Sequence, residues 1–242
     1  MAFLRVAGLC KSFGGLRAIH DLDFSVEEGE IVGVIGPNGS GKTTALNLLT
    51  GFLRPDSGKV TFRGEDITGL PRYRVSQKGV ARTFQLVKPF LESTALENVM
   101  VGRAYGHSPA GSLAAVAEES IGILDQVGLA DKAKVIGKDL TVMQRKRLEL
   151  ARALAAKPNL LLLDELMAGL NPREAEDACS LIRLIRDSNI TIIVVEHIVK
   201  AVCNLSDRVL VLNMGEKIAE GPPDAIVRNP DVVSLYLGKA HA

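Results

Sequence analysis

The sequence lacks both a long apolar run and a strong excess of charge of either sign. No run approaches the roughly 18 apolar residues of a membrane-spanning helix, and the longest candidate, residues 160–163, has only the length of a strand. Residues 1–6 do not place a long apolar stretch after a charged one, so we expect no signal peptide and a soluble protein that stays in the cytosol. A net charge of +1 gives no reason to expect a nucleic-acid partner.

Cysteines are few, and Cys10, Cys179 and Cys203 stand far apart in apolar surroundings. An odd number with this spacing is typical of reduced, packed thiols in a reducing compartment, and we assign them no chemistry. The 242 residues, 47% of them apolar and 24% charged, suffice for one large α/β domain, or for such a core with a small appended subdomain.

The sequence is organised around residues 36–43, GPNGSGKT, which fit the pattern G-x-x-x-x-G-K-[ST]. Glycines let the backbone turn where a Cβ would clash, so that successive N–H groups can point inward at phosphate oxygens. Lys42 adds a charge at the β- and γ-phosphates, and the Thr43 hydroxyl can ligate Mg²⁺. The predicted nucleotide-binding residues are Gly36, Pro37, Asn38, Gly39, Ser40, Gly41, Lys42, Thr43 and Thr44.

A glycine-rich segment with one lysine can also be no more than a tight turn. Here, however, the apolar run 30–35 predicts a buried strand before it, and residues 44–50 predict a helix after it. The positive end of that helix dipole would face a bound anion. Because strand, loop and helix come in the order that phosphate binding needs, we expect the chain to bind a nucleoside triphosphate.

The N-terminal part of the chain predicts strands. Alternating apolar residues indicate strands at 3–9 and 21–26, with a turn at 11–15 between them. Further strands at 58–63 and 80–84 bracket a short helix that begins at Pro71. We expect an antiparallel sheet here, at the edge of the nucleotide site.

The rest of the chain predicts helices, followed by alternating strands and helices. Residues of roughly 90–150 are expected to form a helical insert, because residues 94–97 match a capping box and apolar residues keep helical spacing up to Gly128. Later strands, separated by helices such as 173–187, predict a parallel sheet covered by helices. These strands are expected at 160–163, 191–195 and 208–212.

Two adjacent carboxylates, Asp164 and Glu165, follow the apolar strand 160–163. At the carboxyl end of a strand beside the phosphate loop, Asp164 can hold the Mg²⁺ shell while Glu165 reaches an attacking water. The alternative is a buried strand that simply exits through acidic residues. The phosphate loop upstream favours the catalytic interpretation.

Three further residues are candidates whose individual signals are weak. Gln85 ends a predicted strand, where its amide can touch Mg²⁺ or its water, although a glutamine there is usually only solvated. His197 follows the strand 191–195 and can hydrogen-bond a γ-phosphate or orient Glu165, although a lone histidine is more often structural. Phe13 can stack on adenine, or it can be an ordinary core or surface aromatic.

Taken together and in order, these motifs resemble the ATP-binding subunits of ABC transporters. Residues 36–43 match Walker A, Asp164 and Glu165 match Walker B, and residues 168–171 match the D-loop. Gln85 and His197 match the Q-loop and the switch histidine, and Phe13 the adenine-stacking aromatic. The match covers essentially the whole chain, and softer motifs at 82–85, 97–102, 168–172 and 235–238 look like the branched-chain amino acid importers.

The resemblance implies an α/β fold with a P-loop NTPase core, an antiparallel β subdomain and a helical subdomain. It implies a single ATP-binding domain over residues 1–242, with the helical subdomain at about 90–150. ATP and Mg²⁺ would be the cofactors, Glu165, His197 and Gln85 the catalytic residues, and Thr43, Gln85 and Asp164 the metal ligands. It further implies a dimer with a second ATPase subunit, homomeric or heteromeric, and docking onto membrane permeases near Gln85.

The sequence departs from the family at three places. The signature Leu-Ser-Gly-Gly-Gln should precede a helix at 145–156, but residues 140–144 read LTVMQ. Val142 and Met143 thus place side chains where glycines would let N–H groups close on a γ-phosphate. Leu166 replaces the usual proline after the catalytic glutamate, and Asn171 the usual D-loop aspartate.

We interpret the chain as an ATPase subunit at the cytoplasmic face of the inner membrane, which powers import of a small nutrient, most readily a branched-chain amino acid delivered by a substrate-binding protein. An ATPase of a lipid or lipopolysaccharide exporter shares many of the motifs. A soluble ABC protein of repair or translation usually carries two cassettes or a long coiled coil, and 242 residues hold neither. A GTPase would need an Asn-Lys-x-Asp guanine motif, which the sequence lacks.

Overall fold

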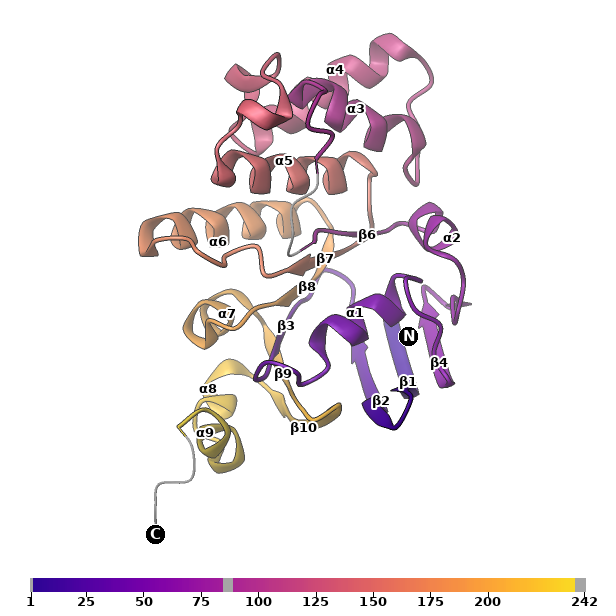
Figure 1. The fold of residues 1–242 in the computed structure, drawn as a ribbon, viewed down its shortest axis with the longest axis vertical. Coiled ribbons are helices and arrows are strands. Elements are labelled where there is room, and N and C mark those ends of the chain that lie inside the picture. The colour runs from indigo at the N-terminus through magenta and orange to yellow at the C-terminus, as the bar shows by residue number, and fades with distance from the viewer. Residues whose placement is uncertain (1, 85–88, 238–242) are drawn as a thin grey trace.

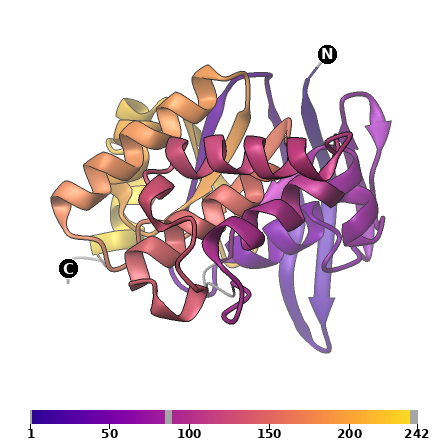
Figure 2. The same ribbon diagram turned by 90° about the horizontal axis from the view of Figure 1, so that it is seen from above.

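The computed structural model describes residues 2–84 and 89–237. Within these residues the strands form a six-stranded sheet, in the order β10-β9-β3-β8-β7-β6, and a four-stranded sheet, in the order β2-β1-β4-β5. Seen from above, helices overlie the larger sheet and the antiparallel strands extend to one side (Figure 2). This arrangement has the parallel sheet, the antiparallel sheet and the helices that the sequence predicts.

The six-stranded sheet carries the expected nucleotide site. Five strands, β9-β3-β8-β7-β6, run parallel, and β10 pairs antiparallel with β9. Every residue of β3, β7 and β8 is buried, as expected for strands covered on both faces. The bounds are β3 Ile31–Ile35, β6 Val80–Arg82, β7 Leu160–Asp164, β8 Thr191–Val195, β9 Arg208–Asn213 and β10 Glu216–Gly221.

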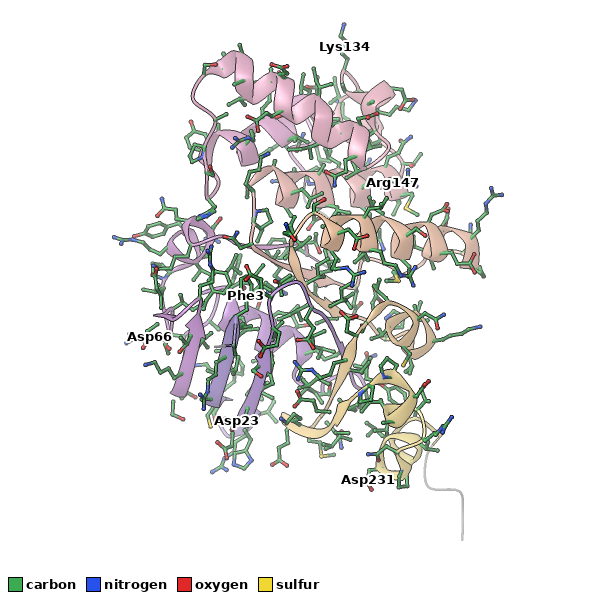
Figure 3. The ribbon with its side chains drawn as sticks, turned by 180° about the vertical axis from the view of Figure 1, so that it is seen from behind. Phe3, Asp23, Asp66, Lys134, Arg147 and Asp231 are labelled. Carbon is green, nitrogen blue, oxygen red and sulfur yellow. The ribbon has the colours of Figure 1, made fainter. Side chains whose placement is uncertain are left out.

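The smaller sheet packs on the larger one through helix α1. Ala45, Leu46 and Leu49 of α1 share one apolar cluster with residues of β1, β2 and β3. Figure 3 shows Phe3 in the interior, and Asp23 and Asp66 at the outer side of these strands. The strands of this sheet are β1 Leu4–Phe13, β2 Leu16–Val26, β4 Ser57–Phe62 and β5 Glu65–Asp66.

Two groups of helices lie at opposite ends of the molecule. Helices α3, α4 and α5 stack beyond α6 at one end, and α8 and α9 lie at the other, near the C-terminus (Figure 1). The bounds are α1 Lys42–Leu49, α2 Arg72–Gln77, α3 Ala95–Tyr105, α4 Leu113–Gln126, α5 Val142–Ala155, α6 Pro172–Asp187, α7 Val199–Leu205, α8 Pro223–Ile226 and α9 Pro230–Leu237.

Two expectations for the N-terminal strands are wrong. The turn predicted at 11–15 contains only Gly14 and Gly15, because the β1–β2 ladder continues to the pair Phe13–Leu16. The strand predicted at 80–84 ends at Arg82 and does not join the antiparallel sheet. It pairs parallel with β7 instead, which moves the segment before Gln85 to the edge of the six-stranded sheet.

Between about residues 90 and 150 the structure has the helices α3, α4 and α5, and one predicted helix start is wrong. Thr94 and Glu97 form the expected reciprocal capping box at the start of α3, and Gly128 follows α4 with φ +70°. Helix α5, however, begins at Val142 and not at Arg145. Residues 142–144 are therefore its first turn, not a loop before it.

Candidate nucleotide-binding site

Tight backbone packing explains two glycines of the loop 36–43. A Cβ on Gly36, at φ +155°, would stand 2.2 Å from the carbonyl oxygen of Leu212, and one on Gly41, at φ +104°, would stand 2.7 Å from that of Ala18. Both clashes are with backbone, so neither can be relieved by a side-chain movement. The loop thus packs closely between β2 and the β9–β10 hairpin. Pro37 is half-buried, and Asn38 and Gly39 are exposed to solvent.

Lys42 begins α1 and is buried. Its Nζ donates hydrogen bonds to the carbonyl oxygens of Gly36, at 2.8 Å, and Pro37, at 2.9 Å, so the ammonium group lies along the inside of the loop. Burial lowers the pKa of Lys42, and the charges of Glu165 and Asp164 oppose that shift. The structure therefore brings the loop lysine and the two predicted carboxylates into one electrostatic environment.

Asp164 and Glu165 stand where β7 ends. Asp164 is the last residue of the strand, and Glu165 follows in the left-handed region, at φ +51°. That conformation costs a non-glycine residue about 1 kcal/mol or more. A hydrogen bond from the Glu165 N–H to the carbonyl oxygen of Val195, at 2.9 Å, holds it at the end of β8.

Parallel pairing brings the phosphate loop, Glu165 and the His197 segment to one edge. The carboxyl ends of β3, β8 and β7 lead into the phosphate loop, His197 and Glu165 respectively, and neighbouring parallel strands end on the same side. The next strand, β6, leads toward Gln85, which lies outside the described residues. Phe13 comes from the other sheet, at the end of β1, with an exposed ring and the Lys11 ammonium 5.7 Å from its centroid.

A divalent cation fits the oxygen atoms near Asp164. Thr43 and Asp164 line the same groove, and Asp164 Oδ1 is buried without a hydrogen-bond partner among the described residues. Hydroxyl and carboxylate oxygens are the ligands that Mg²⁺ prefers, and it keeps several waters of its own. The other carboxylate oxygen, Oδ2, accepts a 2.6 Å hydrogen bond from Arg82.

The sequence interpretation missed Glu196, which lies between β8 and His197. Its side chain is fully buried, and Oε1 accepts a hydrogen bond from the Met167 N–H at 2.6 Å. Its Oε2 lies 3.9 Å from Nδ1 of His197, whose side chain is half exposed. Glu196 therefore connects the histidine to the segment after Glu165. A carboxylate directly after the apolar run 192–195 was the available signal, similar to the one that identified Asp164.

Burial raises the pKa of Glu196 to about 7, and the nearby Glu165 charge adds to the shift while the Met167 N–H and Lys146 oppose it. Between pH 4.5 and about 7 the folded chain therefore holds a proton that the unfolded chain releases. Folding stability should fall across this window and level off above it, by up to a few kcal/mol in all.

Glu196→Gln removes the titrating group, so its free energy of unfolding should be flatter between about pH 5 and pH 8 than that of the wild type. Urea denaturation at several pH values measures this. The exposed Glu176→Gln serves as a control that should keep the wild-type slope. An unchanged slope in Glu196→Gln would mean that another group causes the pH dependence.

Lys146 of α5 was also missed. Its Nζ donates to the carbonyl oxygens of Leu166, at 3.0 Å, and Ala168. Glu196 accepts a hydrogen bond from the Met167 N–H, which lies between these two carbonyl groups. The buried side chains of Lys146 and Glu196 thus hold residues 166–168, directly after Glu165. The Leu166 side chain is partly buried and packs against the apolar cluster that includes residues of α5 and α6.

The fold agrees with what the sequence matches among known proteins. A family model described as ABC transporter matches residues 19–168, more than half of the chain. The chain belongs to the ABC transporter family. A second model, described as the branched-chain amino acid ATP-binding cassette transporter, matches residues 216–242.

Relatives within the ABC family cover nearly the whole chain. The high-affinity branched-chain amino acid transport ATP-binding protein BraF of Pseudomonas aeruginosa is 41% identical, and LivG of Escherichia coli K12, which bears the same description, is 39% identical. Each alignment spans 98% of both proteins. The crystal structure of the ADP conformation of MJ1267, an ATP-binding cassette of an ABC transporter, matches with a TM-score of 0.88 and 32% identity over 99% of this chain and 100% of that one.

These comparisons confirm the family and the fold class, and the chain is an ABC-type ATPase that binds nucleotide. They do not test the roles of single residues. No helix in residues 2–84 or 89–237 is long and apolar enough to cross a membrane.

Two of the departures from the ABC motifs have a local explanation as helix caps. Thr141 is the N-cap of α5 and exchanges hydrogen bonds with Gln144, and Asn171 is the N-cap of α6 and exchanges them with Glu174. Serine, threonine, asparagine and aspartate all cap helices through a side-chain oxygen. Threonine for serine and asparagine for aspartate thus preserve the caps. Val142, by contrast, stands 71% exposed in the first turn of α5.

A groove of about 960 Å³ opens between α1 and α2 on one side and α3 and α5 on the other. Exposed aromatic side chains and three arginines line it, and it reaches Thr43 and Asp164 at its base. Glu149 of α5, at its wall, accepts a hydrogen bond from the Phe84 N–H, one residue before Gln85. The aromatic and arginine members are Phe52, Tyr73, Phe84, Tyr105, Arg72, Arg82 and Arg152.

Proposed function

We propose that this chain is the ATP-hydrolysing subunit of an ABC importer for branched-chain amino acids. The observation that carries the proposal is the meeting of the phosphate loop, Asp164, Glu165 and the His197 segment at one edge of the parallel sheet. The substrate class is supported by the full-length similarity to BraF and LivG and by the match at residues 216–242.

The loop N–H groups, Lys42 and the N-terminus of α1 bind the phosphates of ATP in this proposal. Backbone donors and the helix dipole favour the polyanion, and the buried ammonium of Lys42 adds a point charge that needs no large rearrangement. Phe13, exposed at the end of β1, offers a ring face to the adenine base.

Glu165 orients the attacking water and accepts its proton, and the imidazole of His197 steadies the γ-phosphate and Glu165. The contacts of Glu196 and Lys146 hold the backbone that follows Glu165. Thr43 and Asp164, with Gln85, hold Mg²⁺. When bound, the ion supplies positive charge that offsets the charge of the phosphate oxygens.

The partners in this proposal are a second ABC ATPase and two permease subunits. Residues 1–242 act as one domain, with residues of about 90–150 as its helical subdomain, on the cytoplasmic face of the inner membrane. A cytoplasmic loop of a permease, amphipathic and acidic, fits the groove lined by aromatic side chains and by Arg72 and Arg152. A substrate-binding protein acts only through the permeases.

Lys42→Ala tests the phosphate site. The variant should lose far more affinity for ATP than for adenosine, because the lost contact is to phosphate. Calorimetric titration of both ligands measures the difference. The matched control is Lys59→Ala, which removes an exposed lysine from the antiparallel sheet and should leave both affinities unchanged. Equal losses for the two ligands in Lys42→Ala would indicate a folding defect and contradict the assignment.

A further inference from the structure

Arg82, the last residue of β6, forms a buried ion pair with the proposed metal ligand. Its Nη2 donates to Asp164 Oδ2 at 2.6 Å, and the two side chains are 4% and 2% exposed. Its Nη1 donates to Asn47 Oδ1 of α1, also at 2.6 Å. The guanidinium is thus held between the helix that follows the phosphate loop and the Walker B aspartate.

The backbone next to Arg82 is fixed to β7. The Thr83 N–H donates to the carbonyl oxygen of Leu162 at 3.0 Å, and the Thr83 hydroxyl accepts from the Asp164 N–H at 3.2 Å. Arg82 therefore stands at a defined distance from Asp164, which the parallel pairing of β6 with β7 sets.

A stack of side chains connects Arg82 to the groove surface. The Arg82 guanidinium lies 5.1 Å from the centroid of the Phe84 ring, and that ring meets Phe52 edge-on at 5.3 Å. The Arg72 guanidinium lies over the Phe52 ring, 5.4 Å from its centroid. Phe52 and Phe84 are each about two-fifths exposed and line the groove, so an occupant of the groove would touch the stack.

We propose that Arg82 is a built-in counter-cation of Asp164 that competes with Mg²⁺ for its charge, and that the stack of Phe84, Phe52 and Arg72 ties its position to the groove. A guanidinium and a divalent ion on one carboxylate repel each other, and this repulsion is strong where water is excluded. Moving Arg82 away from Asp164 would strengthen metal binding. A partner that shifts the aromatic pair would thereby change the metal site. The inference rests on the proposed Mg²⁺ site and adds to it a link from the groove.

The experiment measures how much Mg²⁺ improves ADP binding. Calorimetry gives the ADP dissociation constant of the full chain in EDTA and in excess Mg²⁺. The metal enhancement is the constant in EDTA divided by the constant in Mg²⁺. Arg82→Gln should raise this enhancement about tenfold or more, because a unit charge close to a divalent ion is removed. Arg82→Lys keeps the charge and should stay near the wild-type value.

Phe84→Ala tests the stack without leaving a buried charge unpaired. It should raise the metal enhancement roughly two- to fivefold, the scale of one lost cation–π contact. Phe90→Ala is the matched control, because the Arg152 guanidinium lies 4.7 Å from the Phe90 ring centroid, while the stack that reaches Arg82 consists of Phe84, Phe52 and Arg72. Its enhancement should equal that of the wild type.

An equal or smaller metal enhancement in Arg82→Gln would overturn the counter-cation. Equal metal enhancements in Phe84→Ala and Phe90→Ala would overturn the link between Arg82 and the groove. A wild-type chain that binds ADP equally with and without Mg²⁺ would contradict the proposed metal site itself, which separates that failure from the other two. If Arg82→Gln does not fold, Phe84→Ala tests both parts of the proposal, and a metal enhancement no higher than that of Phe90→Ala then overturns both.

Discussion

Glu165→Gln is expected to lower the rate of ATP turnover about 10²-fold or more while ATP affinity stays nearly unchanged, the usual scale for a positioned proton acceptor. Glu165 lies where the chain leaves β7, and its charge acts on Lys42 inside the phosphate loop. Glutamine keeps the shape and the backbone contacts of Glu165 but cannot accept the proton of an attacking water.

Steady-state phosphate release by the chain, assembled with its partners, measures the rate, and calorimetry measures the affinity. The exposed Glu176→Gln makes the same chemical change on α6 and should keep the wild-type rate. Near-normal hydrolysis by Glu165→Gln would remove Glu165 from the proposed role.

Val142→Gly/Met143→Gly is expected to raise the turnover of a homodimer of this chain by roughly 10² to 10³, by analogy with the gain from a preorganised oxyanion donor. In the head-to-tail dimer that the family resemblance implies, each signature completes the ATP site of the opposite chain. The first N–H groups of α5 have no partner within the helix, but the Val142 side chain stands exposed among them. Glycines would allow these donors to reach a γ-phosphate.

The same reasoning predicts asymmetry between two ATPase subunits. A homodimer of this chain, with both signatures altered, should hydrolyse ATP slowly, whereas a heterodimer with an intact partner signature should keep one good site. That site would be built on Lys42, Asp164, Glu165 and His197 of this chain. An unchanged rate in the double-glycine variant, with dimer formation and ATP occupancy confirmed, would mean that Thr141 and the helix dipole suffice.

Much of the fold could be predicted because local patterns and tertiary structure agree. The apolar runs of β3, β7 and β8 are buried throughout, so their boundaries follow from composition alone. Because parallel strands end at one edge, Asp164, Glu165 and His197 could be assigned to one site before their positions were known.

The contacts that the sequence did not predict depend on pairing between distant segments, which no local pattern encodes. Strand β6 is only three residues long, so nothing in its composition shows that it pairs with β7 and places Arg82 on Asp164. Lys146 and Glu196 meet the same backbone segment from positions 50 residues apart in sequence. Their roles follow from the packing of α5 and β8 around that segment, and charge spacing along the chain does not reveal it.

The most direct test of the account is ATP-driven uptake of labelled leucine into proteoliposomes that contain this chain, its partner ATPase, its permeases and the substrate-binding protein. The proposed function predicts uptake that requires ATP on the side where this chain is bound and that is lost when Lys42→Ala replaces the wild-type chain. Uptake that persists in Lys42→Ala, or an assembled complex that hydrolyses ATP but moves no branched-chain amino acid, would contradict it.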